Sequence, residues 1–161
     1  MARIQAVIET RSSGQSSGWG LGFRGLYRVL RLVDPFLRRA WLAYGLGNVV
    51  EVTIDGRRSG RPRRILIGLL VADDQWFIGH PNGEAQWTRN LDSAGGALLV
   101  GWPGQAPVRF EASLLPFGPD RDRAIRATGQ HPFPGNFIYW LGQGHVARVG
   151  RYYRLELDPD G

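Results

Sequence analysis

The sequence predicts a small, mainly antiparallel β-barrel that carries a few helices. Six short segments have the alternating or continuous apolar pattern of strands, and clusters of glycine, proline, asparagine and aspartate separate them. The chain has 161 residues and no cysteine, and this length can bury a core without disulfides. We therefore expect one domain of mixed α+β class over residues 23–161, after a flexible segment at residues 1–22.

Two short basic helices are expected within residues 23–46. The segment that begins at Phe23 has an apolar face at helical spacing and arginines on the opposite face. Asp34-Pro35 is typical of a helix start, so a second helix is expected from there toward Gly45. The first apolar face consists of Leu26, Tyr27, Leu30 and Val33, and the basic face of Arg24, Arg28 and Arg31.

The strands follow one another in a way that favours antiparallel pairing. Asp73-Asp74 is typical of a tight hairpin turn, and Pro103-Gly104 of a second turn. The expected strands cover residues 49–54, 65–71, 75–79, 96–102, 108–115 and 146–157. The expected helices after the third strand cover residues 85–94, 119–128 and 137–141.

The composition excludes several kinds of chemistry. All twenty basic residues are arginine, which excludes a Schiff-base lysine. His80, His131 and His145 are not clustered with carboxylates, so no metal site is expected. The sequence also shows no Ser-His-Asp or Cys-His pattern.

The net charge of +6 is concentrated near the N-terminus, where residues 1–48 hold seven arginines and two acids. Several interpretations stay open. The basic helices either attach to an anionic membrane surface, or close over an apolar site, or they pack on the barrel with their arginines in water. No signal-peptide pattern or long apolar window is present, so a cytoplasmic location is expected, with peripheral contact at the inner face of the membrane left open.

The run GRRSGRPRR at residues 56–64 places five arginines between two predicted strands. Gly56 and Gly60 permit backbone conformations in which successive N–H groups point at one oxyanion. Guanidinium groups add forked contacts to phosphate or carboxylate. The run is either an anion-binding loop, with a phosphorylated ligand as the natural hypothesis, or a solvated hairpin.

The order of strand, GRRSGRPRR, strand, hairpin, strand, GHPNG and W-x-x-N-L resembles the deazaflavin-dependent nitroreductase family over about residues 37–157. That family has the split β-barrel fold of flavin-nucleotide-binding oxidoreductases. The resemblance implies binding of coenzyme F420, a deazaflavin with a phosphodiester and an acidic glutamate tail. It also implies hydride transfer from the reduced coenzyme to a small-molecule acceptor such as a quinone, an enone or a nitro compound.

The resemblance carries site residues over position by position. The basic and hydroxyl positions of the family's G-R-[KR]-[ST]-G fall on Arg58 and Ser59, and the arginine after proline falls on Arg63. Ile65 would lie beside the ring. The cofactor-binding residues that the resemblance implies are Arg57, Arg58, Ser59, Arg63, Ile65, His80, Pro81, Asn82, Gly83, Trp87 and Asn90.

The loop at residues 80–83 departs from the family, which usually has Ser-x-Gly-Gly there, often with a lysine. This chain has His-Pro-Asn-Gly, which removes a hydroxyl and a positive charge. Asn82 can donate hydrogen bonds and Gly83 permits close backbone approach. FMN in place of F420 therefore stays open, as does a non-catalytic carrier of the coenzyme or of a lipid-like molecule.

No catalytic side chain follows from the sequence alone. Tyr139 and Trp140 fall where the family often places aromatic residues that line the substrate, and burial against the barrel is the alternative. A proton could come from Tyr139, His80 or solvent. A nucleic-acid partner is not expected, because no recognised nucleic-acid module accompanies the pI near 10.7. A homodimer stays open, since FMN-binding relatives are usually dimers.

Overall fold

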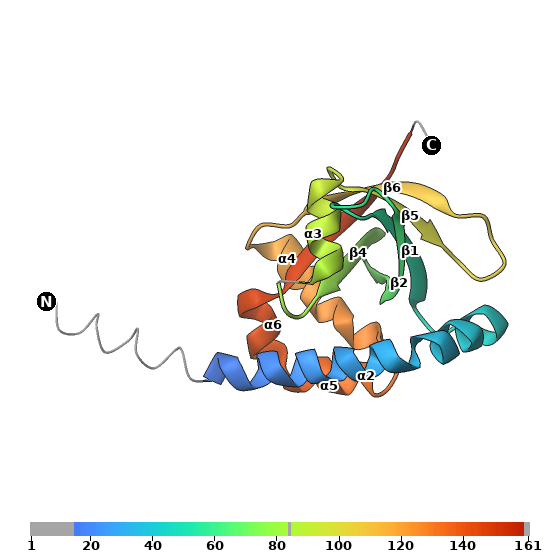
Figure 1. The fold of residues 1–161 in the computed structure, drawn as a ribbon. Coiled ribbons are helices and arrows are strands. Elements are labelled where there is room, and N and C mark those ends of the chain that lie inside the picture. The colour runs from blue at the N-terminus through green and yellow to red at the C-terminus, as the bar shows by residue number, and fades with distance from the viewer. Residues whose placement is uncertain (1–14, 84, 160–161) are drawn as a thin grey trace, which may run out of the picture.

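One curled antiparallel sheet dominates the computed structural model, which describes residues 15–83 and 85–159 (Figure 1). The predicted antiparallel barrel is confirmed. Across the sheet the strands are β2 (Pro62–Gly68), β1 (Val49–Asp55), β5 (Ala97–Gly101), β6 (Val108–Leu114), β7 (Arg151–Leu157), β4 (Gln75–His80) and β3 (Leu70–Ala72). Since β2 and β3 form opposite edges but are joined through Leu69 alone, the sheet has to curl until its edges approach each other.

The stretch predicted as one strand over residues 65–71 is therefore two strands, and that prediction is wrong at Leu69. The chain changes its pairing partner there, from β1 to β4. Asn48 fixes the crossing: its backbone carbonyl accepts the Leu69 N–H at 2.8 Å and its side-chain amide donates to the Leu69 carbonyl at 2.9 Å. A continuous apolar run cannot reveal such a change of partner.

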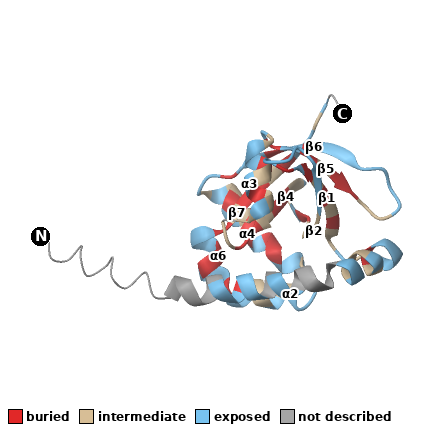
Figure 2. Cartoon of the chain, in the orientation of Figure 1, coloured by how far each residue is buried: buried red, intermediate tan, exposed pale blue. Residues whose placement is uncertain are grey.

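The hydrophobic core has two parts on the two faces of the sheet. Figure 2 shows buried residues both in the strands and in helix α6. In β4, Ile78 points into the barrel, whereas Phe77 points to the outer face, where helices cover the sheet. The barrel interior holds Val50, Val52, Ile54, Leu69, Ile78, Leu91, Leu98, Val100, Phe110, Ala112, Tyr153 and Leu155. The outer cluster holds Phe23, Leu70, Phe77, Leu115, Ala124, Ile125, Ala127, Val146 and Tyr152.

The helices after β4 are α3 (Gln86–Ser93), α4 (Pro119–Arg126), the 3₁₀ turn η1 (Ala127–Gln130), α5 (Gly135–Leu141) and α6 (Gln143–Val149). The predicted strand at residues 146–157 is wrong in its first part, which forms α6. The spacing of Val146 and Val149 fits one turn of a helix, so the segment suits a helix as well as a strand. The helix forms because it buries Val146 in the outer cluster. Gly150 then separates α6 from β7.

A single helix, α2 (Gln15–Tyr44), replaces the two helices that Asp34-Pro35 suggested, and Pro35 lies inside it. Phe23 and Trp41 are both buried, and their spacing of about five turns keeps them on one face, so both halves dock on the same surface. The Trp41 indole N–H donates to the Val49 carbonyl at 2.8 Å. Together these anchors offset the hydrogen bond that Pro35 removes.

The N-terminal predictions are only partly covered by the structure. Residues 1–14 lie outside the described part of the chain, and α2 begins within the segment expected to be flexible. Arg24 and Arg28 are exposed as predicted. The side chains of Leu26, Tyr27, Leu30, Arg31 and Val33 lie outside those described. No helix in residues 15–83 and 85–159 combines the length and hydropathy needed to cross a bilayer.

Candidate functional site

The arginine run forms the tight turn of the β1–β2 hairpin. The Gly56 N–H donates to the Arg61 carbonyl at 3.0 Å, and the Gly60 N–H donates to the Gly56 carbonyl at 2.8 Å. Gly60 has a φ of +62°, a region that glycine adopts at little cost. The Ser59 hydroxyl accepts the Arg61 N–H at 3.3 Å. The turn is thus held by its own hydrogen bonds.

Arg57 joins this hairpin to α3. Its guanidinium donates to the Gln86 side-chain carbonyl at 3.2 Å and to that of Asn90 at 3.5 Å. The backbone N–H of Arg57 also donates to the side-chain oxygen of Asn90, at 3.4 Å. The structure therefore brings together two regions that the sequence separates by about thirty residues, and Asn90 is one of the contacts between them.

Three arginines of the turn remain available to a ligand. Arg58, Arg61 and Arg63 are exposed, and within the described residues their side chains make no hydrogen bond or ion pair. Arg64 differs, because its guanidinium lies 3.9 Å from the Glu51 carboxylate. Like charges held on one turn repel one another, and an anion bound between them would relieve that repulsion.

Strand β2 continues from this turn along an edge of the sheet, with β1 as its neighbour in the strand order. An edge strand presents alternate N–H and carbonyl groups that its sheet does not pair. Arg38 of α2 uses one of them, since it donates to the Arg64 carbonyl at 2.8 Å while pairing with Glu51 at 2.5 Å. Ile65, on the same strand, is half-buried and packs on the barrel core.

The loop at residues 80–83 is directed mainly into the protein. Pro81 is buried, and the His80 ring contacts the backbone of Asn82 through Nδ1. The Asn82 side-chain oxygen lies 2.6 Å from Nε2 of His145 in α6. A Cβ at Gly83 would lie 2.7 Å from the Val149 carbonyl, so this glycine is required by packing against α6.

Trp87 is half-buried, with its ring centre 6.3 Å from that of His80 and 6.0 Å from that of Tyr153. A polar group that the sequence analysis did not identify lies beside it. The Tyr153 hydroxyl donates to Asp92 at 2.9 Å, and Arg151 pairs with the same carboxylate at 3.0 Å. Burial and the Asp92 carboxylate raise the pKa of Tyr153. No local pattern relates position 92 to β7, because Asp92 lies on α3 and meets β7 only through tertiary packing.

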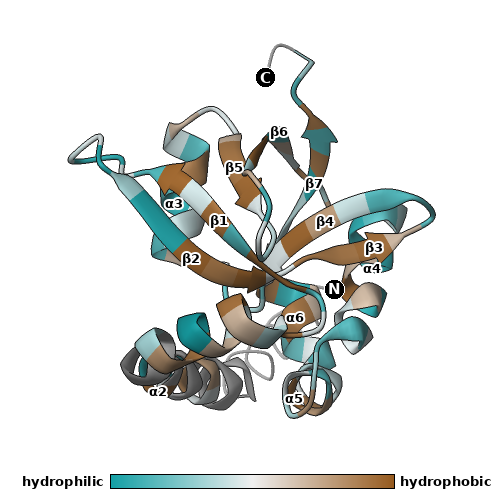
Figure 3. Ribbon diagram, turned by 90° about the vertical axis from the view of Figure 1, so that its right-hand side faces the viewer, coloured by the Kyte–Doolittle hydropathy of each residue, from teal (hydrophilic) through white to brown (hydrophobic). Residues whose placement is uncertain are grey.

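Tyr139 and Trp140 lie on α5, away from the β1–β2 turn (Figures 1 and 3). The Tyr139 ring packs against His131 at 4.8 Å between ring centres and against Phe23 at 5.9 Å. Trp140 is exposed and stacks on Phe137 at 5.8 Å. Neither aromatic residue is brought beside the arginines.

Burial lowers the pKa of all three histidines. The pKa of His131 falls to about 4, and the pKa of His80 falls despite the opposing contact with the Asn82 backbone. For His145, the charge of Arg148 adds to the effect of burial on the pKa. All three rings are therefore neutral at pH 7. Among the described residues, no group of three or more His, Cys, Asp or Glu side chains could hold a metal ion.

We expect His131 to make the fold acid-sensitive. The folded-state pKa of His131, about 4, lies below its usual value of 6.5. The contribution of the neutral His131 ring to the free energy of unfolding is therefore fully present above pH 6.5 and is lost as the pH falls toward 4. After allowance for partial exposure, the free energy of unfolding should fall by about 2 kcal/mol over this range because of this group. Urea unfolding of wild type and His131→Phe at several pH values measures the difference. Parallel pH dependences for the two proteins would contradict the assignment.

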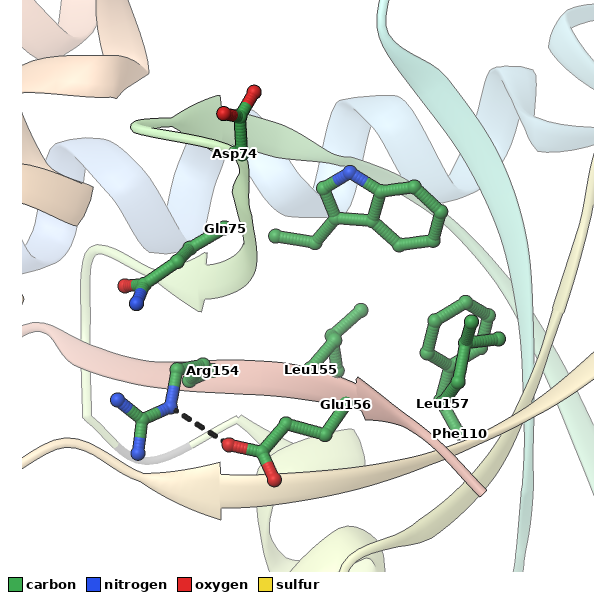
Figure 4. Close-up of a pocket in the computed structure, with 8 residues that line it drawn as sticks. Asp74, Gln75, Phe110, Arg154, Leu155, Glu156 and Leu157 are labelled. Carbon is green, nitrogen blue, oxygen red and sulfur yellow. Dashed lines mark ion pairs between the residues drawn. The ribbon is translucent and has the colours of Figure 1, made fainter. Parts of the chain in front are cut away.

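Two adjoining pockets lie at the end of the barrel where β4 and β6 begin and β7 ends, and Figure 4 shows the first of them. They measure about 340 and 400 Å³ and share Trp76, Phe110 and Leu157 as walls. The ring centre of Trp76 lies 5.3 Å from that of Phe110 and 6.1 Å from that of Trp102. Both pockets are open to solvent, and the walls of the first are completed by the polar side chains Asp74, Gln75, Arg154 and Glu156. The alternation of the strands could have indicated these side chains, but not that they leave space between them.

No family model and no curated protein matches the sequence. Solved structures do match. One is an F420-H2 dependent reductase, FDR-A, with 17% identity over 68% of this chain and 94% of that chain, at a TM-score of 0.53. A second, described as a domain-swapped dimer, has 15% identity over 82% of this chain and 99% of that chain, at a TM-score of 0.54.

A third match is a protein from Listeria innocua described as a candidate pyridoxamine 5′-phosphate oxidase. It has 14% identity over 79% of this chain and 94% of that chain, at a TM-score of 0.50. The predicted split β-barrel fold is thereby confirmed. At these identities the likeness concerns the fold, and activity has to be argued from the site.

Proposed function

We propose that this protein is an oxidoreductase that binds coenzyme F420 and transfers hydride from the reduced coenzyme to a small electrophilic acceptor such as a quinone, an enone or a nitro compound. The observation that carries the proposal is the preformed β1–β2 turn, where Arg58, Arg61 and Arg63 are exposed and have no side-chain partner within the described residues. A phosphodiester with an acidic tail is the kind of group that such a turn would bind. The fold shared with the F420-H2 dependent reductase supports it.

The residues fit the coenzyme unevenly. Arg57, Arg58, Ser59 and Arg63 would hold the anionic part at the turn, and the backbone around Ile65 on the β2 edge would lie along the ring. The 80–83 loop contributes less, because the Asn82 side-chain oxygen contacts His145 and Gly83 packs on Val149. Trp87 and Asn90 lie on α3, which Arg57 of the turn contacts through hydrogen bonds. They would contribute to coenzyme binding by fixing the position of α3 beside the turn.

When bound, the coenzyme supplies the hydride, so the protein need not provide a nucleophile. The arginines of the turn would neutralise the coenzyme's tail, and the backbone around Ile65 on the β2 edge would orient its ring toward the acceptor. Tyr139 packs against Phe23 and His131, and the buried His80 has a lowered pKa. We therefore assign the proton that completes the product to solvent.

FMN is the alternative cofactor, because its phosphate would fit the same turn. The similar structure from Listeria innocua is described as a candidate pyridoxamine 5′-phosphate oxidase. A carrier that binds the coenzyme without turnover is a further alternative. Fluorescence titration with F420, with FMN and with duplex DNA at near-physiological salt separates these cases. Saturable binding of F420 with reduction of a quinone or nitro acceptor would support the proposal. Binding of FMN alone would replace it, and F420 binding without turnover would identify a carrier.

We also propose a homodimer, supported by the likeness to a structure described as a domain-swapped dimer. Sedimentation velocity over a range of protein concentrations measures the assembly. A single monomeric species at the highest concentration would reject the dimer without touching the cofactor proposal.

Replacing both Arg58 and Arg63 by alanine should weaken F420 binding by about 2 kcal/mol or more, roughly thirtyfold, because two charge-assisted contacts are lost. Both side chains are exposed, so the thermal midpoint should change little. Fluorescence titration measures the affinity. The matched control is Arg109→Ala with Arg126→Ala, which removes the same charge from exposed positions elsewhere. Equal losses in both double variants, or none in the first, would refute the assignment of the turn.

A further inference from the structure

The outer side of the helix layer, formed by α2 and residues 133–141, exposes several large apolar side chains. Figure 3 shows α2 and α5 on the same side of the barrel, and the Phe23 ring of α2 lies 5.9 Å from the Tyr139 ring of α5. The exposed fraction is 81% for Phe133, 66% for Trp140 and 50% for Phe137, and α2 adds Phe36 at 76%. Exposed apolar side chains gathered on neighbouring segments usually mark a binding surface.

The same layer is basic. Arg24, Arg28 and Arg39 of α2 are exposed, and their side chains make no ion pair with the residues that the structure describes. Arg28 and Arg39 are eleven residues apart, about three helical turns, so they lie on one line along the helix. The buried Phe23 and Trp41 define the opposite face. Arg28 and Arg39 therefore point away from the barrel, and Arg24, which directly follows Phe23, lies on the flank of the helix.

Residues 133–141 contain no charged side chain at all. The layer thus combines an uncharged aromatic segment with exposed arginines on the neighbouring helix. Aromatic side chains settle at the boundary between lipid headgroups and acyl chains, and arginines near the surface bind the phosphates of anionic lipids. A protein partner would have to supply acids opposite the arginines and an apolar pocket beside them, whereas an anionic lipid surface offers both everywhere.

We propose that this helix layer binds the surface of an anionic lipid bilayer. Helix α2 lies parallel to the surface, Arg24, Arg28 and Arg39 contact lipid phosphates, and Phe133, Phe137 and Trp140 insert among the headgroups. Arg38 of α2 reaches the Arg64 carbonyl at the base of the β1–β2 turn, but the tip of the turn projects away from this helix layer and takes no part in the contact (Figure 3). The proposal is therefore independent of which cofactor the turn binds.

The test is flotation with vesicles of phosphatidylcholine mixed with phosphatidylglycerol, compared with vesicles of phosphatidylcholine alone. The full chain should bind the mixed vesicles, less tightly as salt rises, and should bind the neutral vesicles much more weakly. Replacing Arg24, Arg28 and Arg39 together by glutamine should weaken binding on the order of 100-fold, since each contributes about fivefold near an anionic surface. The matched control replaces Arg58, Arg61 and Arg63 by glutamine, which removes the same charge from the β1–β2 turn and should leave binding nearly unchanged.

A second measurement locates the aromatic side chains. Brominated acyl chains in the mixed vesicles should quench part of the tryptophan fluorescence, and Trp140→Phe should remove that part while leaving vesicle binding nearly intact. Equal losses in the two triple variants would show general charge attraction and overturn the proposal. Failure to bind the mixed vesicles, or equal binding to neutral ones, would overturn it too. So would a stable dimer in solution that Phe133→Ala with Trp140→Ala dissociates, because the face would then be covered by a second copy.

Discussion

Arg121→Met should lower the free energy of unfolding by about 3–5 kcal/mol, since hydrogen bonds from a charged group to buried carbonyls contribute about 1.5–3 kcal/mol each. The Arg121 side chain is buried in α4, and its guanidinium donates to the carbonyls of Ala147 and Gly150 at 2.8 Å and of Val146 at 3.4 Å. It thereby caps the C-terminal end of α6, where a positive charge also complements the helix dipole. Methionine has similar length but cannot donate.

Urea unfolding measures this effect. Arg126→Met is the matched control, because Arg126 is the last residue of the same helix, α4, and is exposed. This change should lower the free energy of unfolding by less than about 0.5 kcal/mol. Arg121→Lys should recover part of the loss, since an ammonium keeps the charge but cannot reach three carbonyls with a rigid fork. A stability for Arg121→Met equal to or above that of wild type would mean that the cost of burying the guanidinium exceeds what its hydrogen bonds return.

Gly79→Ala should be nearly as costly, at about 3 kcal/mol or more, because overpacking a filled core forces the backbone or a large ring to move. Gly79 pairs with Tyr152 across β4 and β7, and Tyr152 is 1% exposed. A Cβ at position 79 would lie 2.3 Å from two carbons of that ring. The ring cannot turn aside without leaving the outer core cluster.

A double-mutant cycle identifies the clash. If the ring is the cause, Gly79→Ala should cost much less in a Tyr152→Leu background than in wild type. Gly144→Ala provides a contrast, because a methyl group added at this position of α6 would meet nothing within 4 Å beyond its chain neighbours and the backbone of its own helix. The change should be neutral or slightly stabilising. Equal costs of Gly79→Ala in both backgrounds would assign the effect to the strand backbone instead.

Most of the fold could be predicted because local patterns specify it. The Asp73-Asp74 turn has positive φ at both residues, as expected for a tight hairpin, and the strands on either side pair as predicted. The errors arose where tertiary contacts override local signals. Pro35 is tolerated because Phe23 and Trp41 anchor α2 on both sides of it, and residues 146–149 are helical because Val146 is buried against the outer face of the sheet.

The candidate site was predictable to the extent that it lies on one hairpin. The arginine turn could be placed from its glycines and flanking strands, but its contact with α3 through Arg57 could not. The inward direction of Asn82 was equally hidden, because it depends on His145, sixty-three residues away. Whether a polar residue on a loop faces a ligand or the protein interior depends on which distant segment packs against it.

The position of β7 between β6 and β4 has a consequence for biosynthesis. The hairpins β1–β2, β3–β4 and β5–β6 can each pair locally as soon as they leave the ribosome, but β4 and β6 acquire their shared neighbour only after β7 has left it too. Until then the nascent chain exposes two long unpaired strand edges, which are prone to aggregate. A stall that leaves β4 and β6 outside the ribosome while β7 is still inside it should therefore increase the demand of this protein for chaperones more than a stall before β6 has emerged.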